Sequence, residues 1–220
     1  MYLSNRDIRW AIQRGLLIVN PPPDEEKTGY DETSIDLHLD DTAKAARVWD
    51  MDAFRGDQAR SGNAAELRLG TFHFKNIAKQ YLKEVPEGTP DSWNPVFARG
   101  KEVIVKPTGF VLWTTHEWVG TSEDNNPQLI CFVNAKSTRA RTGVVVHLSA
   151  PTIHAGWQGN ITLEVVNFGP FDLVLKPGDV IAQLTVATVS SPPDLDLKIG
   201  ESATARQTNP SASKPGKRKK

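Results

Sequence analysis

Short apolar runs separated by glycine and proline turns fill the chain from Lys101 to Val186, and they restrict the fold more than any other feature. The runs have the length of strands, and turns such as Pro107-Thr108-Gly109 and Lys176-Pro177-Gly178-Asp179 end them. The pattern shows no alternation of strands with helices and no glycine-rich phosphate loop that opens a helix. It therefore predicts an antiparallel β-sandwich or barrel. The predicted strands are Glu102–Val105, Phe110–Thr114, Leu129–Val133, Gly143–Leu148, Gly159–Asn167, Asp172–Leu175 and Val180–Val186.

The N-terminal segment predicts a short helix. Ser4 is a suitable N-cap, and Asp7 stands where its side chain can reach back to the free amides. An apolar stripe within residues 8–12 follows at helical spacing, and Gly15 is a plausible end of the helix. Two more strands are predicted, an apolar one at Leu16–Asn20 and a half-buried one at Ser34–Leu39, where polar and apolar residues alternate.

Residues 41–100 have a weaker pattern, which suggests an insertion that covers the core or packs between subunits. Ala43–Ala46 suits a helical turn, whereas Arg55–Ala65 and Pro86–Pro95 are loops by composition. Isolated apolar side chains suggest strands at Leu67, Leu69, Phe72 and Phe74.

The length of 220 residues suits one β domain over residues 1–190, followed by a polar, disordered tail over 191–220. The formal net charge is zero, which argues against the broad basic surface of a nucleic-acid-binding protein. Cys131 is the only cysteine, so neither an intrachain disulfide nor a cysteine-rich zinc site can form. The N-terminus has no signal-peptide core, and no apolar run is long enough to cross a bilayer. We expect a cytoplasmic protein without nucleic-acid or membrane partners.

One polar turn concentrates cations and hydroxyl groups between two predicted strands. It contains Lys136, Ser137, Thr138, Arg139 and Arg141. Hydroxyl groups, successive amides and cations in one turn suit a phosphate group. An exposed basic turn without a ligand has the same composition, and this alternative stays open.

Glu164 is a single carboxylate inside the apolar run I-T-L-E-V-V. Strand alternation places it on one face with Thr162 and Val166. A carboxylate among buried strands needs a partner, and such groups often act as acids or bases. The alternative is a glutamate that faces solvent. Trp157, near Gly156 and Gly159, either forms the wall of a flat pocket for a base or sugar or packs in the core.

The histidines have no metal-ligand spacing, so each is expected to be structural. The sequence H-E-W at His116 is not a metalloprotease motif, and no histidine and aspartate adjoin Ser137 in sequence to suggest a catalytic triad. The histidines are His38, His73, His116, His147 and His154.

Three stretches together resemble the dCTP deaminase branch of the dUTPase-like superfamily, in the same order and spacing. They are A-K-S-T-R-A-R-T-G-V-V-V-H, A-P-T-I-H-A-G-W-Q-G-N-I-T-L-E and L-K-P-G-D-V-I-A-Q-L. The N-terminal N-R-D-I and the strand S-I-D-L-H-L also fit, and the resemblance covers most of residues 1–190 outside 41–100. It implies a mainly β, distorted jelly-roll or β-barrel fold of the dUTPase-like type with a short N-terminal helix. It also implies a homotrimer with active sites between subunits.

The resemblance further implies zinc-independent, hydrolytic removal of the 4-amino group of dCTP, which gives dUTP and ammonia, with Mg²⁺ bound through the substrate triphosphate. Glu164 matches the catalytic glutamate that carries the proton from water to the pyrimidine ring and on to ammonia. Ser137 and Arg141 match the residues that arrange the water, the glutamate and the base, and the backbone of Ala150 helps to hold the water. The expected substrate-binding residues are Lys136, Thr138, His154, Trp157 and Gln183.

Three departures from the family pattern stand out. His154 replaces the aspartate of an I-D-P-G motif that activates water in dUTPases, and Lys136 replaces an arginine. The segment at residues 205–207 matches the lid of the deaminases only faintly. The alternatives are a dUTPase-like nucleotide pyrophosphatase, which His154 disfavours, and a non-catalytic nucleotide-binding trimer, which Glu164 disfavours.

Overall fold

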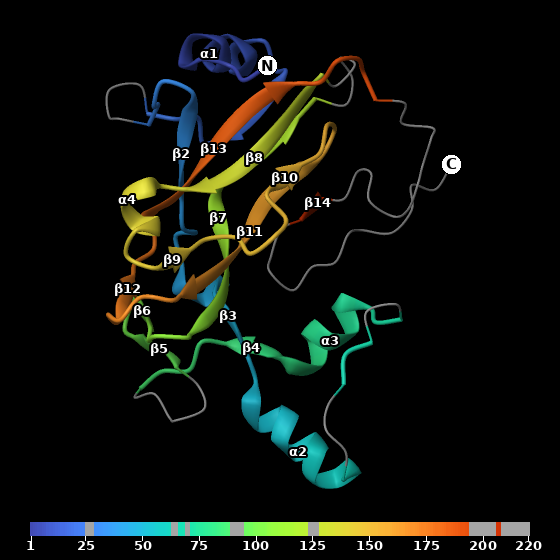
Figure 1. Cartoon of the computed structure of the whole chain (residues 1–220), viewed down its shortest axis with the longest axis vertical. Helices are drawn as coiled ribbons and strands as arrows, with labels where there is room; N and C mark the ends of the chain where they lie inside the picture. The colour runs from blue at the N-terminus through green and yellow to red at the C-terminus, as the bar shows by residue number, and fades with distance from the viewer. Residues whose placement is uncertain are drawn as a thin grey trace.

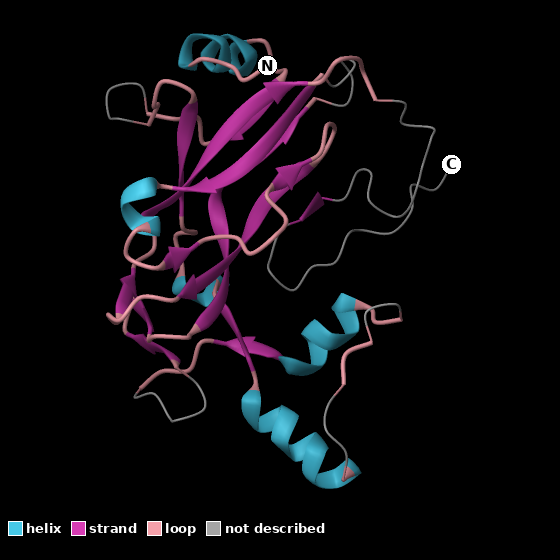
Figure 2. Ribbon diagram, viewed as in Figure 1, coloured by secondary structure: helices cyan, strands magenta, loops and turns pink. Residues whose placement is uncertain are grey.

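The chain folds into a body of three β-sheets with helices at its periphery (Figures 1 and 2). The computed structural model describes residues 1–24, 29–62, 66–68, 71–88, 95–122, 128–193 and 206–207. Within them, the mainly β, jelly-roll-like fold that the sequence predicts is confirmed.

The largest sheet is organised around its two longest strands, β7 (Phe110–Thr121) and β11 (Gln158–Asn167), which pair antiparallel. β7 extends past Thr114, the predicted end of its strand, because β1 and β11 both pair with its second half. The other strands of this sheet are β1 (Leu17–Asn20), β3 (Arg47–Trp49), β4 (Leu82–Glu84), β9 (Val144–Val145) and β14 (Arg206–Gln207).

A second sheet has the order β10-β8-β13-β2, and a third has the order β12-β6-β5. Every strand pair in these two sheets is antiparallel, as predicted. The strands are β2 (Ser34–His38), β8 (Leu129–Ala135), β10 (Thr152–Ile153), β13 (Val180–Thr188), β5 (Val96–Arg99), β6 (Glu102–Val105) and β12 (Leu173–Leu175).

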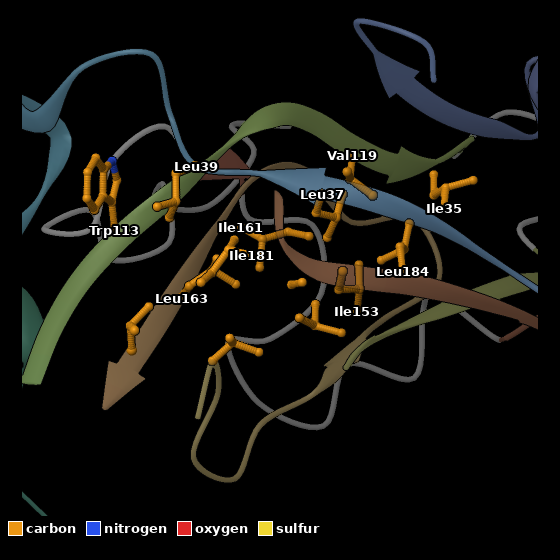
Figure 3. Close-up of a cluster of buried hydrophobic side chains, with 14 of the residues drawn as sticks. Ile35, Leu37, Leu39, Trp113, Val119, Ile153, Ile161, Leu163, Ile181 and Leu184 are labelled. Carbon is orange, nitrogen blue, oxygen red and sulfur yellow. The ribbon is translucent and has the colours of Figure 1, made fainter. Parts of the chain in front are cut away.

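One hydrophobic core joins the two larger sheets (Figure 3). Leu37 of β2, Leu163 of β11 and Leu184 of β13 all contribute fully buried side chains to it. Each such side chain stabilises the fold by about 1.5–3 kcal/mol. The core also covers Trp113, whose ring is fully buried.

The predicted N-terminal helix is present as α1 (Asn5–Gln13). The Ser4 side chain accepts a hydrogen bond from the Asp7 amide and donates one to the Asp7 carboxylate. Ile8 and Ala11 are buried against the sheet, and Gly15 takes a positive φ of 67° just after the helix. A positive φ is the conformation that glycine supplies at helix ends.

Two predictions within residues 41–100 are wrong. Residues 55–61, predicted as loop, belong to helix α2 (Met51–Ser61), and Phe74, predicted in a strand, begins helix α3 (Phe74–Tyr81). Asp50 caps α2 at its start, and Gly62 ends it with a positive φ. No residue of α2 is buried, so the helix lacks the apolar periodicity that would reveal it.

The α2–α3 segment is held together by contacts of its own; in Figure 1, α3 lies beside β4 and α2 lies below the sheets. Phe54 stacks on Tyr81 with ring centroids 4.2 Å apart. The Tyr81 hydroxyl donates a hydrogen bond of 2.6 Å to Asp57, which holds the pKa of that carboxyl below its usual value. Among the other predictions for residues 41–100, the helical turn is confirmed as Ala43–Ala45. Leu67 and Phe72 lie in irregular, exposed chain, and residues 69 and 89–94 lie outside the described part.

Two strand predictions also need correction. β2 was expected to be half-buried, but residues 34–37 are buried on both faces, because polar Ser34 and Asp36 are covered as well. The strand expected at 143–148 is reduced to β9, because the chain leaves β11 after Val145 and turns toward β8. Of the predicted disordered tail, only residues 191–193 and 206–207 are described. None of the described helices is long and apolar enough to cross a bilayer.

Cys131 is expected to be chemically inert in the folded protein. Complete burial raises the pKa of its thiol to about 12, so that at pH 8 roughly one molecule in ten thousand carries the reactive thiolate. A thiol reagent such as DTNB should label the unfolded chain in guanidinium within minutes and leave the native protein unlabelled over the same time. Equal labelling rates for the two states would contradict the burial of this side chain.

Candidate active site

Glu164 lies on the less buried face of β11, and a backbone amide orients its carboxylate. Leu163 and Val165 point into the core, whereas Glu164 between them is only partly buried. Its Oε2 accepts a hydrogen bond of 2.9 Å from the amide of Leu148. The predicted alternation is therefore confirmed, and the environment lies between the two predicted alternatives: the carboxylate is neither enclosed in the core nor fully solvated. Ala150 follows in the same exposed loop, two residues after Leu148.

The polar turn forms the short helix α4 (Ser137–Ala140), directly after β8. Ser137, Thr138 and Arg141 are exposed on it. The turn is fixed at its far end, because the Phe168 amide donates a hydrogen bond of 2.8 Å to the carbonyl of Gly143. Within the described part of the chain, no hydrogen bond or ion pair joins Glu164 to Ser137 or Arg141.

Close backbone packing holds the end of this turn against the end of β11. A Cβ atom on Gly169 would come within 2.0 Å of the Thr142 carbonyl oxygen. Only glycine fits at position 169, because there is no room for a Cβ atom. This close packing places the segment that carries Arg141 beside the strand that carries Glu164.

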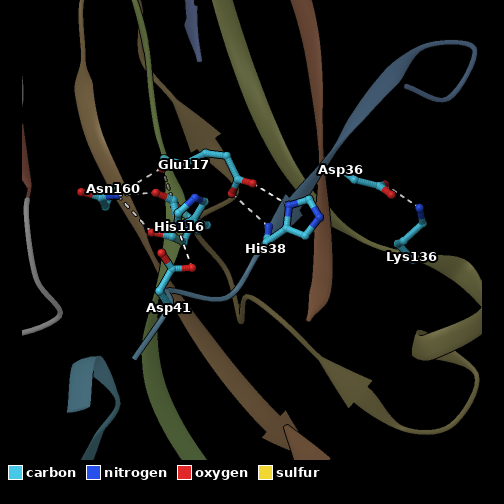
Figure 4. Close-up of polar contacts among 8 residues, drawn as sticks. Asp36, His38, Asp41, His116, Glu117, Lys136 and Asn160 are labelled. Carbon is cyan, nitrogen blue, oxygen red and sulfur yellow. Dashed lines mark hydrogen bonds and ion pairs between the residues drawn. The ribbon is translucent and has the colours of Figure 1, made fainter. Parts of the chain in front are cut away.

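Lys136, just before α4, is held by two carboxylates, and Figure 4 shows its contact with Asp36. Its Nζ lies 2.5 Å from Asp36 and 3.6 Å from Asp31. The Asp36 side chain is only 8% exposed, so this ion pair is largely shielded from water. Gln183 lies beside it, because β13 pairs Gln183 with Asp36 of β2 on one side and with Asn134 of β8 on the other.

The structure places His154 and Trp157 away from the α4 turn of the same chain. They belong to the turn between β10 and β11, and Ile153 pairs with Cys131 of β8. Lys136 follows the other end of β8, so the two groups are separated by roughly 17 Å along that strand. His154 is exposed, whereas Trp157 is partly buried and packs against the core. The expected substrate-binding residues therefore form two groups within one chain.

A bulge between β7 and β11 sets the face on which Glu164 lies (Figure 4). The register shifts between Asn160 and Thr162, and the side-chain amide of Asn160 donates to the carbonyls of Thr115, His116 and Glu117 over 3.0–3.3 Å. The Thr115 hydroxyl accepts a hydrogen bond of 2.9 Å from the Ile161 amide. The sequence reasoning missed this feature, although the polar T-T-H-E within an otherwise apolar β7 is its signal.

Two histidines pair with carboxylates, which agrees with the structural role expected of them. His38 Nδ1 lies 2.6 Å from Oε1 of the buried Glu117, whose other oxygen accepts from the His38 amide. His116 Nδ1 lies 3.1 Å from Asp41. No group of three His, Cys, Asp or Glu side chains that could hold a metal ion occurs among the described residues.

Replacing Asn160 by alanine is expected to lower the free energy of unfolding by about 1–3 kcal/mol, because three backbone carbonyls lose their shared donor. Asn134→Ala is the matched control, since the Asn134 side chain makes one hydrogen bond among the described residues, of 3.1 Å to the Thr185 hydroxyl, and its loss should cost at most about 1 kcal/mol. Urea denaturation of both variants measures the difference. Equal costs would show that the bulge does not depend on Asn160.

The paired sheets with a short N-terminal helix place the chain among the jelly-roll-like β proteins. A family model described as dCTP deaminase-like matches residues 2–189. The chain belongs to this dCTP deaminase-like family, and the resemblance seen in its sequence motifs is confirmed.

Several named proteins are similar to the chain. A dUMP-forming dCTP deaminase of Methanopyrus kandleri is 28% identical over 192 residues, which cover 86% of this chain and 83% of that protein. A dCTP deaminase of Haloarcula marismortui is 30% identical over 194 residues, covering 88% and 84%. The solved 2'-deoxycytidine 5'-triphosphate deaminase of Agrobacterium tumefaciens superimposes with a TM-score of 0.53 at 15% identity. The match covers 86% of this chain and 48% of that one, so the chain spans about half its length, and this likeness concerns the fold alone.

Proposed function

We propose that the protein hydrolyses dCTP to dUTP and ammonia, with Glu164 as the group that moves the proton. The orientation of the Glu164 carboxylate by the Leu148 amide carries this proposal, together with the membership of the dCTP deaminase-like family. One oxygen of the carboxylate is fixed by the amide, and the other is left to accept a proton from water.

In the proposed reaction, water adds to C4 of the cytosine ring and the amino group leaves. Glu164 takes a proton from the water as the new C–O bond forms and delivers it to N3 of the ring. It then takes the proton of the new C4 hydroxyl and delivers it to the departing amino group, so that the C–N bond breaks, ammonia leaves and the carbonyl of uracil remains. A side chain that acts first as base and then as acid is a common form of general catalysis. Ser137 and Arg141 arrange the water and the base, and the backbone of Ala150 helps to hold the water.

We further propose a homotrimer in which neighbouring subunits complete each site. In support, the two groups of substrate-binding residues, Lys136 with Thr138 and Gln183, and His154 with Trp157, lie far apart within one chain. Exposed apolar side chains also lie beside the α4 turn and in the loop whose amide contacts Glu164: Phe168 is 68% exposed and Leu148 is 53% exposed. Burial of such side chains against a second copy would favour association.

Magnesium would reach this site through the triphosphate of the substrate, whose oxygen atoms are ligands that this ion prefers. The described residues offer no cluster of carboxylates that would hold the ion without the substrate. We propose that zinc takes no part in the reaction.

The direct test is ammonia release from dCTP in the presence of Mg²⁺. Glu164→Gln keeps the size and the hydrogen-bonding capacity of the side chain but cannot accept the proton, so the turnover rate should fall by about 10²–10⁴-fold. Glu102→Gln changes a glutamate of β6 that pairs with Arg99 of β5, outside the proposed site, and should leave the rate near that of the wild type. Nucleotide binding without turnover in the wild type would favour a non-catalytic nucleotide-binding protein.

A second candidate reaction continues to dUMP, as the name of the Methanopyrus kandleri relative says of that protein. This reaction requires release of pyrophosphate in addition to ammonia. The I-D-P-G motif has His154 in place of its aspartate, and this side chain is exposed and offers no carboxylate to activate water.

We therefore expect dUTP and ammonia in equal amounts, without pyrophosphate, when the products from dCTP are separated by ion-exchange chromatography. Removal of Mg²⁺ with EDTA should lower the rate, because the triphosphate loses its counter-ion, whereas the zinc chelator 1,10-phenanthroline should not change it. Stoichiometric pyrophosphate and dUMP would assign the second reaction instead.

A further inference from the structure

The cations of the α4 turn differ in whether a carboxylate already neutralises them. Lys136 lies against Asp36 and Asp31, at 2.5 and 3.6 Å. Arg139 is half-buried and Arg141 is exposed, and neither guanidinium forms an ion pair with a carboxylate in the described part of the chain. The turn therefore holds one neutralised cation and two available ones.

The surroundings of Lys136 are unfavourable for a phosphate. One ammonium faces two carboxylates there, so the cluster has a formal charge of minus one, and it repels a further anion. Movement of the ammonium toward a phosphate would leave the Asp36 carboxylate, only 8% exposed, without its partner. A shielded carboxylate that loses its counter-ion destabilises a protein strongly.

Arg139, unlike Lys136, has a charge that no carboxylate neutralises in the described part of the chain. It lies one turn further along α4, where its amide donates a hydrogen bond of 3.0 Å to the Lys136 carbonyl, so the two residues are close neighbours. Its planar guanidinium can bind two phosphate oxygens at once, which an ammonium cannot do with the same geometry.

We propose that Arg139 binds the polyphosphate of the substrate, and that Lys136 is a positioning residue that fixes the α4 turn to β2 through Asp36. This assignment rests on the proposed function, in which the site takes a nucleoside triphosphate. It moves the phosphate contact from the position where the family usually has arginine to a residue three positions later.

Lys136 can position the turn because it joins three separate segments. It follows the last residue of β8, Asp36 belongs to β2, and Asp31 belongs to the preceding loop, where its amide donates to the Ser34 carbonyl. Ser137 is the next residue after Lys136. A shift of this junction would therefore alter the placement of the Ser137 hydroxyl, and with it the rate of the chemical step rather than the affinity for phosphate.

Calorimetry with inorganic tripolyphosphate tests the assignment independently of turnover, and steady-state kinetics with dCTP tests it during the reaction. Arg139→Leu should weaken tripolyphosphate binding by about 10–100-fold and raise the KM for dCTP by a similar factor, because a charge-assisted contact is lost. Lys136→Met and Asp36→Asn should each leave tripolyphosphate affinity within about threefold of the wild type and lower kcat instead. The Lys136→Met/Asp36→Asn double variant should have a kcat no lower than that of the slower single variant, because all three variants lack the same ion pair.

Lys136→Arg covers the case in which Lys136→Met does not fold. It keeps the charge beside Asp36, so the tripolyphosphate affinity and the unfolding temperature should stay near those of the wild type. A gain of about tenfold in affinity would show that the side chain at this position reaches the phosphate, because the guanidinium could then bind two phosphate oxygens at once.

Loss of tripolyphosphate binding in Lys136→Met that equals or exceeds the loss in Arg139→Leu would overturn the proposal, as would unchanged binding in Arg139→Leu or a wild-type protein that does not bind tripolyphosphate. A wild type that binds tripolyphosphate but releases no ammonia from dCTP would contradict the proposed function and still decide the role of Arg139.

Discussion

The hydrogen bonds from the Asn160 side chain to three successive carbonyls of β7 fix the register of the two longest strands, and the position of Glu164 depends on that register. Side chains alternate along a strand, so a slip by one residue exchanges its two faces. Without the bulge, Glu164 would take the place of Leu163 or Val165 in the core, and a leucine or valine would face the Leu148 loop. The polar contacts of Asn160, near the start of β11, thereby determine which side chain faces the Leu148 loop further along the strand.

Polar contacts also hold the charged side chains that are buried in the protein. Glu117 is 4% exposed and accepts two hydrogen bonds from His38. Asp36 forms an ion pair with the ammonium of Lys136. Asp36 and His38 lie two residues apart on β2, so one strand is tied to the α4 turn at one position and to β7 at the other. Buried carboxylates are costly without such partners. The His38–Glu117 pair therefore connects the two larger sheets, and the Lys136–Asp36 pair fixes the α4 turn to β2.

These pairs also explain how far the sequence could predict the structure. Most of the longer strands from Glu102 onward and helix α1 were predictable, because hydrophobic periodicity and capping residues are local signals. The ion pair of Lys136 with Asp36 joins residues 100 positions apart, and the contact of His38 with Glu117 spans 79 positions, so neither leaves a local pattern. Helix α2 was missed for a different reason, since a helix without a buried face has no apolar stripe.

The candidate site showed a similar division. The sequence patterns predicted that Glu164 lies on the opposite face of its strand from Leu163 and Val165, and the burial pattern of β11 confirms it. They could not predict which cations of the α4 turn are neutralised, because that depends on carboxylates contributed by β2 and the loop before it. A basic turn therefore cannot be treated as a set of equivalent phosphate ligands: the cation nearest the buried carboxylate stabilises the junction of the strands, and the guanidiniums beyond it keep their charge available. A lysine at residue 136 fits this division, because a single ammonium suffices to pair with Asp36, whereas a fork that suits phosphate is present at Arg139.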